Sequence, residues 1–259
     1  MITLNFQISP SYLVYHTITN CSPSRFIDET PDRKVVDFQN AAWSKDKAAN
    51  QFLRFGPNEV NLFTSPSISE IAQRAENLIQ SMIEDATFVP LLAETVESLE
   101  LLKSEWENNY LKTHALVTEM TGLNLNEDFR IFLSHPALKQ GHYQSELRAV
   151  CWAYRNTWPN YNTVYIWHEL LHSFIPGGHL EHAVIQLIAD NELRVSLNGG
   201  NYPPIEGHPY LNKLMGLLIP HWRRYLRSGN KEIGKFISEM DSRPDVKRRL
   251  AVCAEQRAE

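Results

Sequence analysis

Two histidines and one glutamate in the second half of the chain are spaced as in a hydrolytic metal site. The segment 163–174 contains His168, Glu169 and His172, which together read HExxH. Residues i and i+4 of an α-helix lie on the same face, so both imidazoles can reach one Zn²⁺ at about 2.0–2.1 Å. Glu169 projects at a different angle and can act as a general base on the zinc-activated water. The motif therefore predicts a zinc centre for hydrolysis.

The same pattern can also arise by chance, and the 10 histidines of this chain raise that rate. The residues around the motif argue against coincidence because they are uncharged and allow the helix to be buried. Buried histidine and glutamate side chains need partners for their polar atoms, and a metal ion provides them at once. Metal binding is therefore the favoured interpretation. The uncharged flanking residues are Tyr165, Ile166, Leu170, Leu171, Ser173 and Phe174.

A third protein ligand has to come from elsewhere in the chain. A catalytic zinc has three protein ligands and keeps its fourth position open for water. The helix expected after the motif carries several residues that could serve, and residue type alone leaves the choice open. These residues are His179, Glu181, His182, Asp190 and Glu192.

HExxH followed by a glutamate on the next helix resembles the pattern of the gluzincin zinc metallopeptidases. The spacing from His172 to Glu192 is similar to that of thermolysin-like proteins, and Asn191 before Glu192 resembles their Asn-Glu pair. The resemblance implies that Zn²⁺ is bound by His168, His172 and Glu192. It also implies that Glu169 is the base and proton shuttle.

The resemblance spans residues 163–195, and the chain departs from related patterns in two places. Metzincin peptidases read HExxHxxGxxH, but the glycine and third histidine are displaced here, which makes His179 the next candidate after Glu192. Thermolysin-like proteins place an aspartate one turn after the ligand glutamate, where this chain has Ser196. Asp190 could instead support a zinc histidine from another angle.

Peptide hydrolysis also needs a donor, besides the metal, that stabilises the tetrahedral oxyanion. In the resembled family a tyrosine or histidine from a downstream loop usually supplies it. His208 and Tyr210 are the residues that the resemblance implies for this catalytic role. Tyr202, His221 and Tyr225 are the alternatives.

The resemblance implies a zinc-dependent metallopeptidase that cleaves a peptide or protein substrate, with Glu169 as the general base. One alternative is a catalytically inactive or non-peptidase zincin-fold protein that acts as a metal-stabilised binding module. Another is a zinc hydrolase of a non-peptide amide. Glu169→Gln distinguishes an enzyme from the binding module, and a peptide-library assay tests the substrate class.

Composition limits the remaining classes. The chain has 259 residues, 43% apolar and 21% charged, which is ordinary for a folded protein. Its net charge of −5 and the lack of a basic stripe argue against nucleic acid as a partner. No apolar run reaches the ~18 residues of a membrane span, and the N-terminus has no signal-peptide pattern. Three dispersed cysteines favour a reducing compartment, so we expect a cytoplasmic protein, with its oligomeric state left open.

The first part of the chain, residues 1–122, is expected to be mostly helical. It opens with a strand over residues 2–8, where apolar and polar residues alternate. Helical spacing follows over 37–55, 68–82 and 90–121. The last of these helices carries acidic residues that predict a solvent-exposed face, namely Glu94, Glu97, Glu100, Glu105 and Glu107.

The metal-site part, residues 123–259, begins with strands expected at 129–133 and 149–154. The second leads into the HExxH helix, so its free edge could run beside the metal and pair with an extended peptide. A helix over 180–198 comes next, with further helices towards the C-terminus. We therefore expect an α+β, mainly α-helical fold: a single zincin-like domain over 1–259 with a small β-sheet and an N-terminal helical region.

Overall fold

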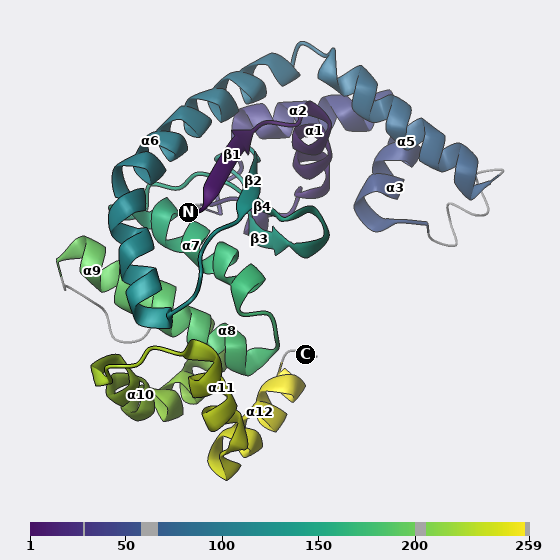
Figure 1. The fold of residues 1–259 in the computed structure, drawn as a ribbon. Helices are drawn as coiled ribbons and strands as arrows, with labels where there is room; N and C mark the ends of the chain where they lie inside the picture. The colour runs from purple at the N-terminus through teal and green to yellow at the C-terminus, as the bar shows by residue number, and fades with distance from the viewer. Residues whose placement is uncertain (28, 58–66, 200–205, 257–259) are drawn as a thin grey trace.

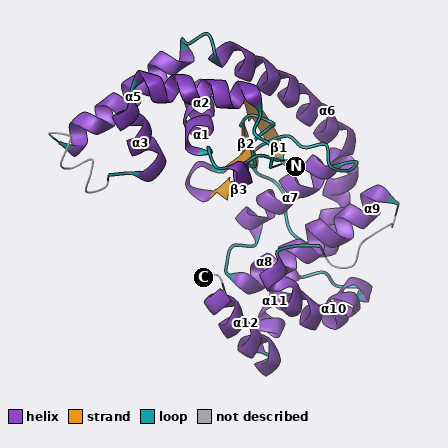
Figure 2. Cartoon of the chain, turned by 180° about the vertical axis from the view of Figure 1, so that it is seen from behind, coloured by secondary structure: helices purple, strands orange, loops and turns teal. Residues whose placement is uncertain are grey.

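A small sheet lies at the centre of a chain that otherwise consists of helices and loops (Figure 1). The computed structural model describes residues 1–27, 29–57, 67–199 and 206–256. Seen from behind, the strands gather at one place among the helices (Figure 2). The α+β class, the predominance of helix and the small sheet are therefore confirmed.

The sheet is mixed, with strand order β1-β2-β4-β3. Parallel pairs join β1 to β2 and β2 to β4, while β3 runs antiparallel to β4 at one edge. All four residues of β4 are buried, as expected of an apolar strand with neighbours on both sides. The strands are β1 (Thr3–Gln7), β2 (Asp128–Leu133), β3 (Gly141–Gln144) and β4 (Ala149–Trp152).

The free edge beside the HExxH helix belongs to β3, so the expectation that strand 149–154 would present it is wrong. β3 covers β4 on that side, with Gly141 paired to Trp152 and Gln144 paired to Ala149. A Cβ at Gly141 would lie 2.8 Å from the Trp152 ring, so glycine allows this close approach.

The helices of the N-terminal part pack against one another around α1. The expected helix over 37–55 is two helices, because Asp46 ends α2 and caps α3, where its Oδ1 accepts from the Ala49 N–H at 3.1 Å. Arg74 on α5 binds the same carboxylate and holds the junction in place. These helices are α1 (Pro10–Thr19), α2 (Arg33–Lys45), α3 (Lys47–Phe55), α5 (Ile68–Ile83) and α6 (Phe88–Thr121).

Two clusters of buried apolar side chains stabilise the described structure. The first lies among α1, α2, α5 and the start of α6, and includes Leu13, Phe38 and Leu91. The second joins the sheet to the later helices and includes Trp106 and Trp167. Because α6 contributes to both clusters, it links the helical N-terminal part to the metal-site part (Figure 1). The assignment of the whole chain to one zincin-like domain stays a prediction.

The HExxH helix is α7 (Tyr161–Phe174), and α6 holds its first turn. Glu105 of α6 accepts from the backbone N–H of Thr163 at 2.7 Å and from the side chain of Asn162 at 2.8 Å. One turn further on, the buried Trp167 indole donates to Thr113 at 2.7 Å. Glu105 was expected on a solvent-exposed face; it caps α7 instead, because the free N–H groups of a helix start attract a carboxylate.

The chain after α7 is helical. The expected helix over 180–198 is α8 (His179–Gln186), a π-helical segment (Leu187–Leu193) and α9 (Arg194–Asn198). Beyond the loop come α10 (Asn212–Arg227), α11 (Ile233–Ser242) and α12 (Pro244–Gln256). Among the described residues, no helix combines the length and apolar character that crossing a membrane requires.

Candidate metal centre

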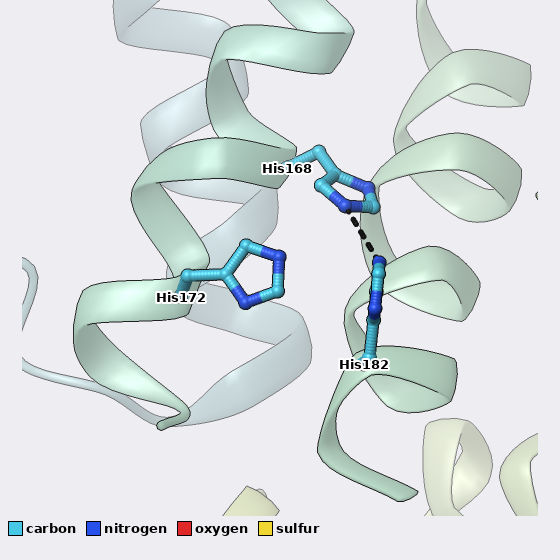
Figure 3. Close-up of side chains that lie close together, drawn as sticks. All are labelled: His168, His172 and His182. Carbon is cyan, nitrogen blue, oxygen red and sulfur yellow. Dashed lines mark hydrogen bonds between the residues drawn. The ribbon is translucent and has the colours of Figure 1, made fainter. Parts of the chain in front are cut away.

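A histidine from α8 meets the two HExxH histidines of α7 (Figure 3). His168 and His172 lie one turn apart on α7, and His182 points toward them from the neighbouring helix. Ligand-capable nitrogens of the three rings all lie within 4.8 Å of one another. His168 Nε2 is 3.2 Å from His182 Nε2. Two nitrogens bound to one tetrahedral zinc at about 2.0–2.1 Å are about 3.3 Å apart, so the distance between His168 and His182 matches that of two ligands of one metal ion.

Glu192, the expected third ligand, lies outside this group, and His182 takes its place beside His168 and His172 as a candidate ligand. The Glu192 carboxylate instead accepts from the indole N–H of Trp222 on α10 at 3.2 Å. Asp190 faces His168. Glu192 is two positions further along, and residues two apart in a helix point in different directions, so Glu192 is turned away from His168. His179, the alternative third ligand, lines the neighbouring cavity but does not join the three histidines.

Asp190 supports His168 from the side away from the other rings. His168 Nδ1 donates to Asp190 Oδ1 at 2.8 Å, and both side chains are buried. Burial alone would lower the pKa of His168, but the charge of Asp190 and its hydrogen bond outweigh burial, so the pKa lies above its ordinary value. A carboxylate on one ring nitrogen holds the proton there and leaves Nε2 available as a ligand. Asp190 thus provides His168 with the carboxylate partner that the resembled family places at the position of Ser196.

The π-helical segment helps to set the direction in which Asp190 points. Within this wider turn, the Asn191 side chain donates to the Gln186 carbonyl, five residues back, at 2.9 Å. Asn191 also donates to the Glu206 carbonyl at 2.9 Å and accepts from the Glu206 N–H at 3.1 Å. Single π turns within helices frequently occur at functional sites. Here the turn aims Asp190 at His168 and ties the downstream loop to the helix.

That loop brings His208 to the histidines. Gly207 has φ +144°, and a Cβ there would lie 2.4 Å from Gln186 Oε1, so glycine lets the loop approach the helix. The ring centroids of His208 and His182 are 4.9 Å apart, and Tyr210 stacks on His208 at 5.5 Å. His208 therefore lies beside the proposed ligands, and Tyr210 packs against it.

The remaining candidates for the oxyanion role do not reach this site. Tyr202 lies outside the described residues. His221 and Tyr225 line a separate cavity of about 240 Å³ that also includes residues of α11. Of the residues considered for this role, His208 is the one that the described structure places against a proposed ligand.

Glu169 is held between α7 and the sheet edge. The backbone of Tyr143 on β3 lies near its carboxylate. Burial raises the pKa of Glu169 above its ordinary value, with Asp190 adding to the rise and with His168 and the Tyr143 backbone opposing it, because both favour the charged form. A carboxyl group with a raised pKa is a stronger base, as proton abstraction from water requires.

His172 has the opposite electrostatic environment to His168. Burial, together with the charges of His168 and His208, lowers the pKa of His172 to about 4. The ring is therefore neutral at neutral pH, and only a neutral imidazole has a lone pair to offer a metal.

Two adjoining cavities extend from the histidines. One has a volume of about 540 Å³ and the other about 420 Å³. Gly141, His168, Glu169 and His208 border both, so the proposed centre lies where they meet. Cavities of roughly 300–1,000 Å³ are typical of ligand sites. The arrangement offers room for a substrate on both sides of the reacting groups.

His182 was among the open candidates, and the sequence contains a signal that favours it. His182, Gln186 and Asp190 follow one another at steps of four residues in an otherwise apolar segment. Residues with this spacing share a face of a helix. Gln186 and Asp190 border the 420 Å³ cavity and His182 borders the other, so this polar face is the one turned toward α7.

Comparison with known proteins adds no relative. No family model, curated protein or solved structure matches the chain. The class of protein proposed below therefore rests on the geometry of the site alone.

Proposed function

We propose that the chain is a zinc-dependent metallopeptidase with a zincin-like core. The observation that carries the proposal is the convergence of His168, His172 and His182 beside Glu169. Three protein ligands leave one position of a tetrahedral zinc open, which is the arrangement of catalytic rather than structural sites. The Asp190 contact to His168 supports the same interpretation, because outer partners of this kind orient zinc-binding histidines.

Zinc bound there would supply a Lewis acid that lowers the pKa of a water and polarises the carbonyl to be cleaved. Glu169 takes the proton of the attacking water and delivers it to the nitrogen of the leaving amine. His208 lies close enough to His182 to donate a hydrogen bond to the carbonyl oxygen as it gains charge. Tyr210 stacks on the His208 ring and orients it.

The free edge of β3 is suited to hold an extended substrate. The Ala153 N–H donates to the Gln140 carbonyl at 3.1 Å, so these two residues form a hydrogen-bonded pair. Along antiparallel strands, hydrogen-bonded pairs alternate with pairs whose backbone groups point away from the partner strand. Gly141 and Tyr143 therefore turn their backbone groups away from β4, toward the free edge. The Tyr143 backbone lies near Glu169, and the groups of Gly141 are placed to pair with a peptide backbone. A substrate that adds to this edge passes directly beside the reacting groups.

A cytoplasmic location and a peptide or protein substrate complete the proposal. Cys21, Cys151 and Cys253 are all unpaired, which supports a reducing compartment.

Metal content and peptide cleavage, measured on the same protein, test the proposal. Wild type and His182→Ala, purified without a histidine tag, would be analysed for zinc and incubated with a mixture of peptides for mass spectrometry. We expect about one zinc per chain and cleavage for wild type, and much less of both for the variant. A wild type that takes up no zinc when zinc is supplied would end the proposal. Zinc without cleavage would favour the binding module.

A further inference from the structure

The two cavities beside the proposed metal centre differ in charge. The 420 Å³ cavity, called here the cationic cavity, is lined by Arg25, Lys139 and Arg155. Among the described residues, neither lysine nor arginine lines the 540 Å³ cavity on the other side. His168, Glu169 and His208 border both cavities, so a substrate that spans the site has one end in a cationic environment.

Two of the three acidic residues that line the cationic cavity already have other partners. Asp190 binds His168 at 2.8 Å, and Glu206 pairs with Arg194 at 3.3 Å. The third is Glu169, the proposed base. Among the described residues, no ion pair joins any of the three cations to an acid that lines the cavity.

Arg155 is the best placed of the three cations. It is half-buried and forms no ion pair with any described residue. Its side chain donates to the Tyr161 hydroxyl at 3.1 Å, while the buried Nε has no hydrogen-bond partner among the described residues. A guanidinium in this state retains donors for a planar anion, and it binds carboxylates in a two-point geometry.

The other two cations, Lys139 and Arg25, have few acidic partners among the described residues. Lys139 has one described ion-pair partner, Glu29, at 3.8 Å, and the Glu29 side chain is 76% exposed. An exposed pair at this distance contributes little. Arg25 has no described ion pair. Both therefore add positive charge to the cavity that Arg155 lines.

The direction of β3 indicates which end of a substrate would meet these cations. Lys139, Gln140 and Gly141 border the cationic cavity, and the following residues of β3 border the other. A peptide that pairs antiparallel with β3 runs from the far cavity toward Gly141 and enters the cationic cavity with its C-terminal part. Trp152, Tyr161 and Tyr165 line the same cavity and offer apolar surface for the side chains.

We propose that the cationic cavity binds a carboxylate of the substrate, on the C-terminal side of the cleaved bond, with Arg155 as its main partner. This inference rests on the proposed peptidase function. The carboxylate can be the free C-terminus of a short peptide or the side chain of an aspartate or glutamate. The same chemistry recognises both, and the experiment separates them.

Binding to a variant that does not turn over gives the test. The probes are three N-acetylated tripeptides: alanine-phenylalanine-alanine as the free acid, the same peptide as its C-terminal amide, and the amide with glutamate in third place. Each would be titrated by calorimetry into Glu169→Gln alone and combined with Arg155→Gln. Arg33→Gln is the matched control, because it removes one positive charge from an exposed side chain that lines neither cavity.

We expect at least one carboxylate probe to bind about tenfold more tightly than the plain amide, as a charge-assisted hydrogen bond predicts. Arg155→Gln should remove this preference, whereas Arg33→Gln should retain it. Preference for the free acid alone indicates recognition of the C-terminus, and preference for the glutamate amide alone indicates an acidic side chain. Lys139→Gln should reduce the same preference and gives a second test if Arg155→Gln fails to fold.

No preference for either carboxylate probe would overturn the inference. A preference that survives in Arg155→Gln would also overturn it, because the carboxylate would then be bound elsewhere, for example by zinc. Failure of the proposed function looks different. Protein that holds no zinc and cleaves no peptide, yet shows the Arg155-dependent preference, keeps the carboxylate site and loses the peptidase.

Discussion

The described part of the chain buries histidines in two regions, and within it only one of these regions forms a candidate site. His16 on α1 is 4% exposed and His168 on α7 is 5% exposed, so burial does not distinguish them. Neither ring nitrogen of His16 makes a hydrogen bond of normal geometry with a described residue, although Gln140 lies nearby. His168 has Asp190 on one nitrogen and His182 facing the other.

The difference shows what a metal site requires beyond burial. Burial in the N-terminal core lowers the pKa of His16 to about 4, which makes it a neutral side chain with no task that the structure identifies. Around His168, a carboxylate fixes the orientation of the ring and further imidazoles converge on its free nitrogen. Convergence and outer support, rather than burial, separate a potential ligand from a structural histidine.

The largest expected effect tests whether the convergent region performs chemistry. Glu169→Gln should lower kcat by about 100- to 10,000-fold, because general acid–base catalysis contributes that much, and should leave zinc content unchanged. Steady-state cleavage of a peptide that wild type cleaves, with metal analysis of the same samples, provides the measurement. Glu192→Gln is the control, since its carboxylate contacts Trp222 and should not affect turnover to this extent. Equal activity in both variants would remove Glu169 from the mechanism.

The next effect concerns the third ligand. His182→Ala should weaken zinc binding by more than about 100-fold, because losing a ligand should cost more than losing one of its outer partners. Glu192→Ala should retain zinc. Competition with a chelator of known affinity measures both variants. The opposite outcome, with zinc retained in His182→Ala and lost in Glu192→Ala, would restore the original expectation from the resemblance.

His16 should control the stability of the metal-free protein rather than its zinc. Its pKa is about 4 when folded and 6.5 in the unfolded chain, so the unfolded state binds more protons between these values. The free energy of unfolding should therefore fall as pH drops from 6.5 to 4, by up to about 3 kcal/mol from this residue. Urea denaturation of wild type and His16→Leu across this range should give a flatter profile for the variant. Parallel profiles would show that His16 is not buried in its neutral form.

The smallest effect concerns the support behind His168. Asp190→Asn keeps the shape of the side chain but removes its charge, and should weaken zinc binding by about 10- to 100-fold. The same chelator competition measures this loss. Asn191→Ala is the comparison variant, because it removes the contacts of the downstream loop but keeps the Asp190 carboxylate, and it should cost less zinc affinity than Asp190→Asn. Equal losses in both variants would mean that the π turn as a whole, rather than the carboxylate, matters.

Sequence patterns alone predicted much of the architecture. Alternating apolar residues predicted β1, helical spacing predicted α6 close to its observed bounds, and the HExxH motif predicted the helix α7. The i, i+4 spacing of His168 and His172 was sufficient to place both rings on one face, because that relation is local to a single helix. These features depend on residues close in sequence, where local geometry leaves few alternatives.

Tertiary structure decided the features that join distant segments. Which of His182 and Glu192 lies beside His168 and His172 depends on how the helix after α7 is rotated, and the π turn changes that rotation. β3 forms the free edge of the sheet because it pairs with β4. Glu105 caps α7 because α6 packs beside the first turn of that helix. Residue spacing sets which side chains share a face of one helix. Only the packing of helices and strands against one another determines what each face meets.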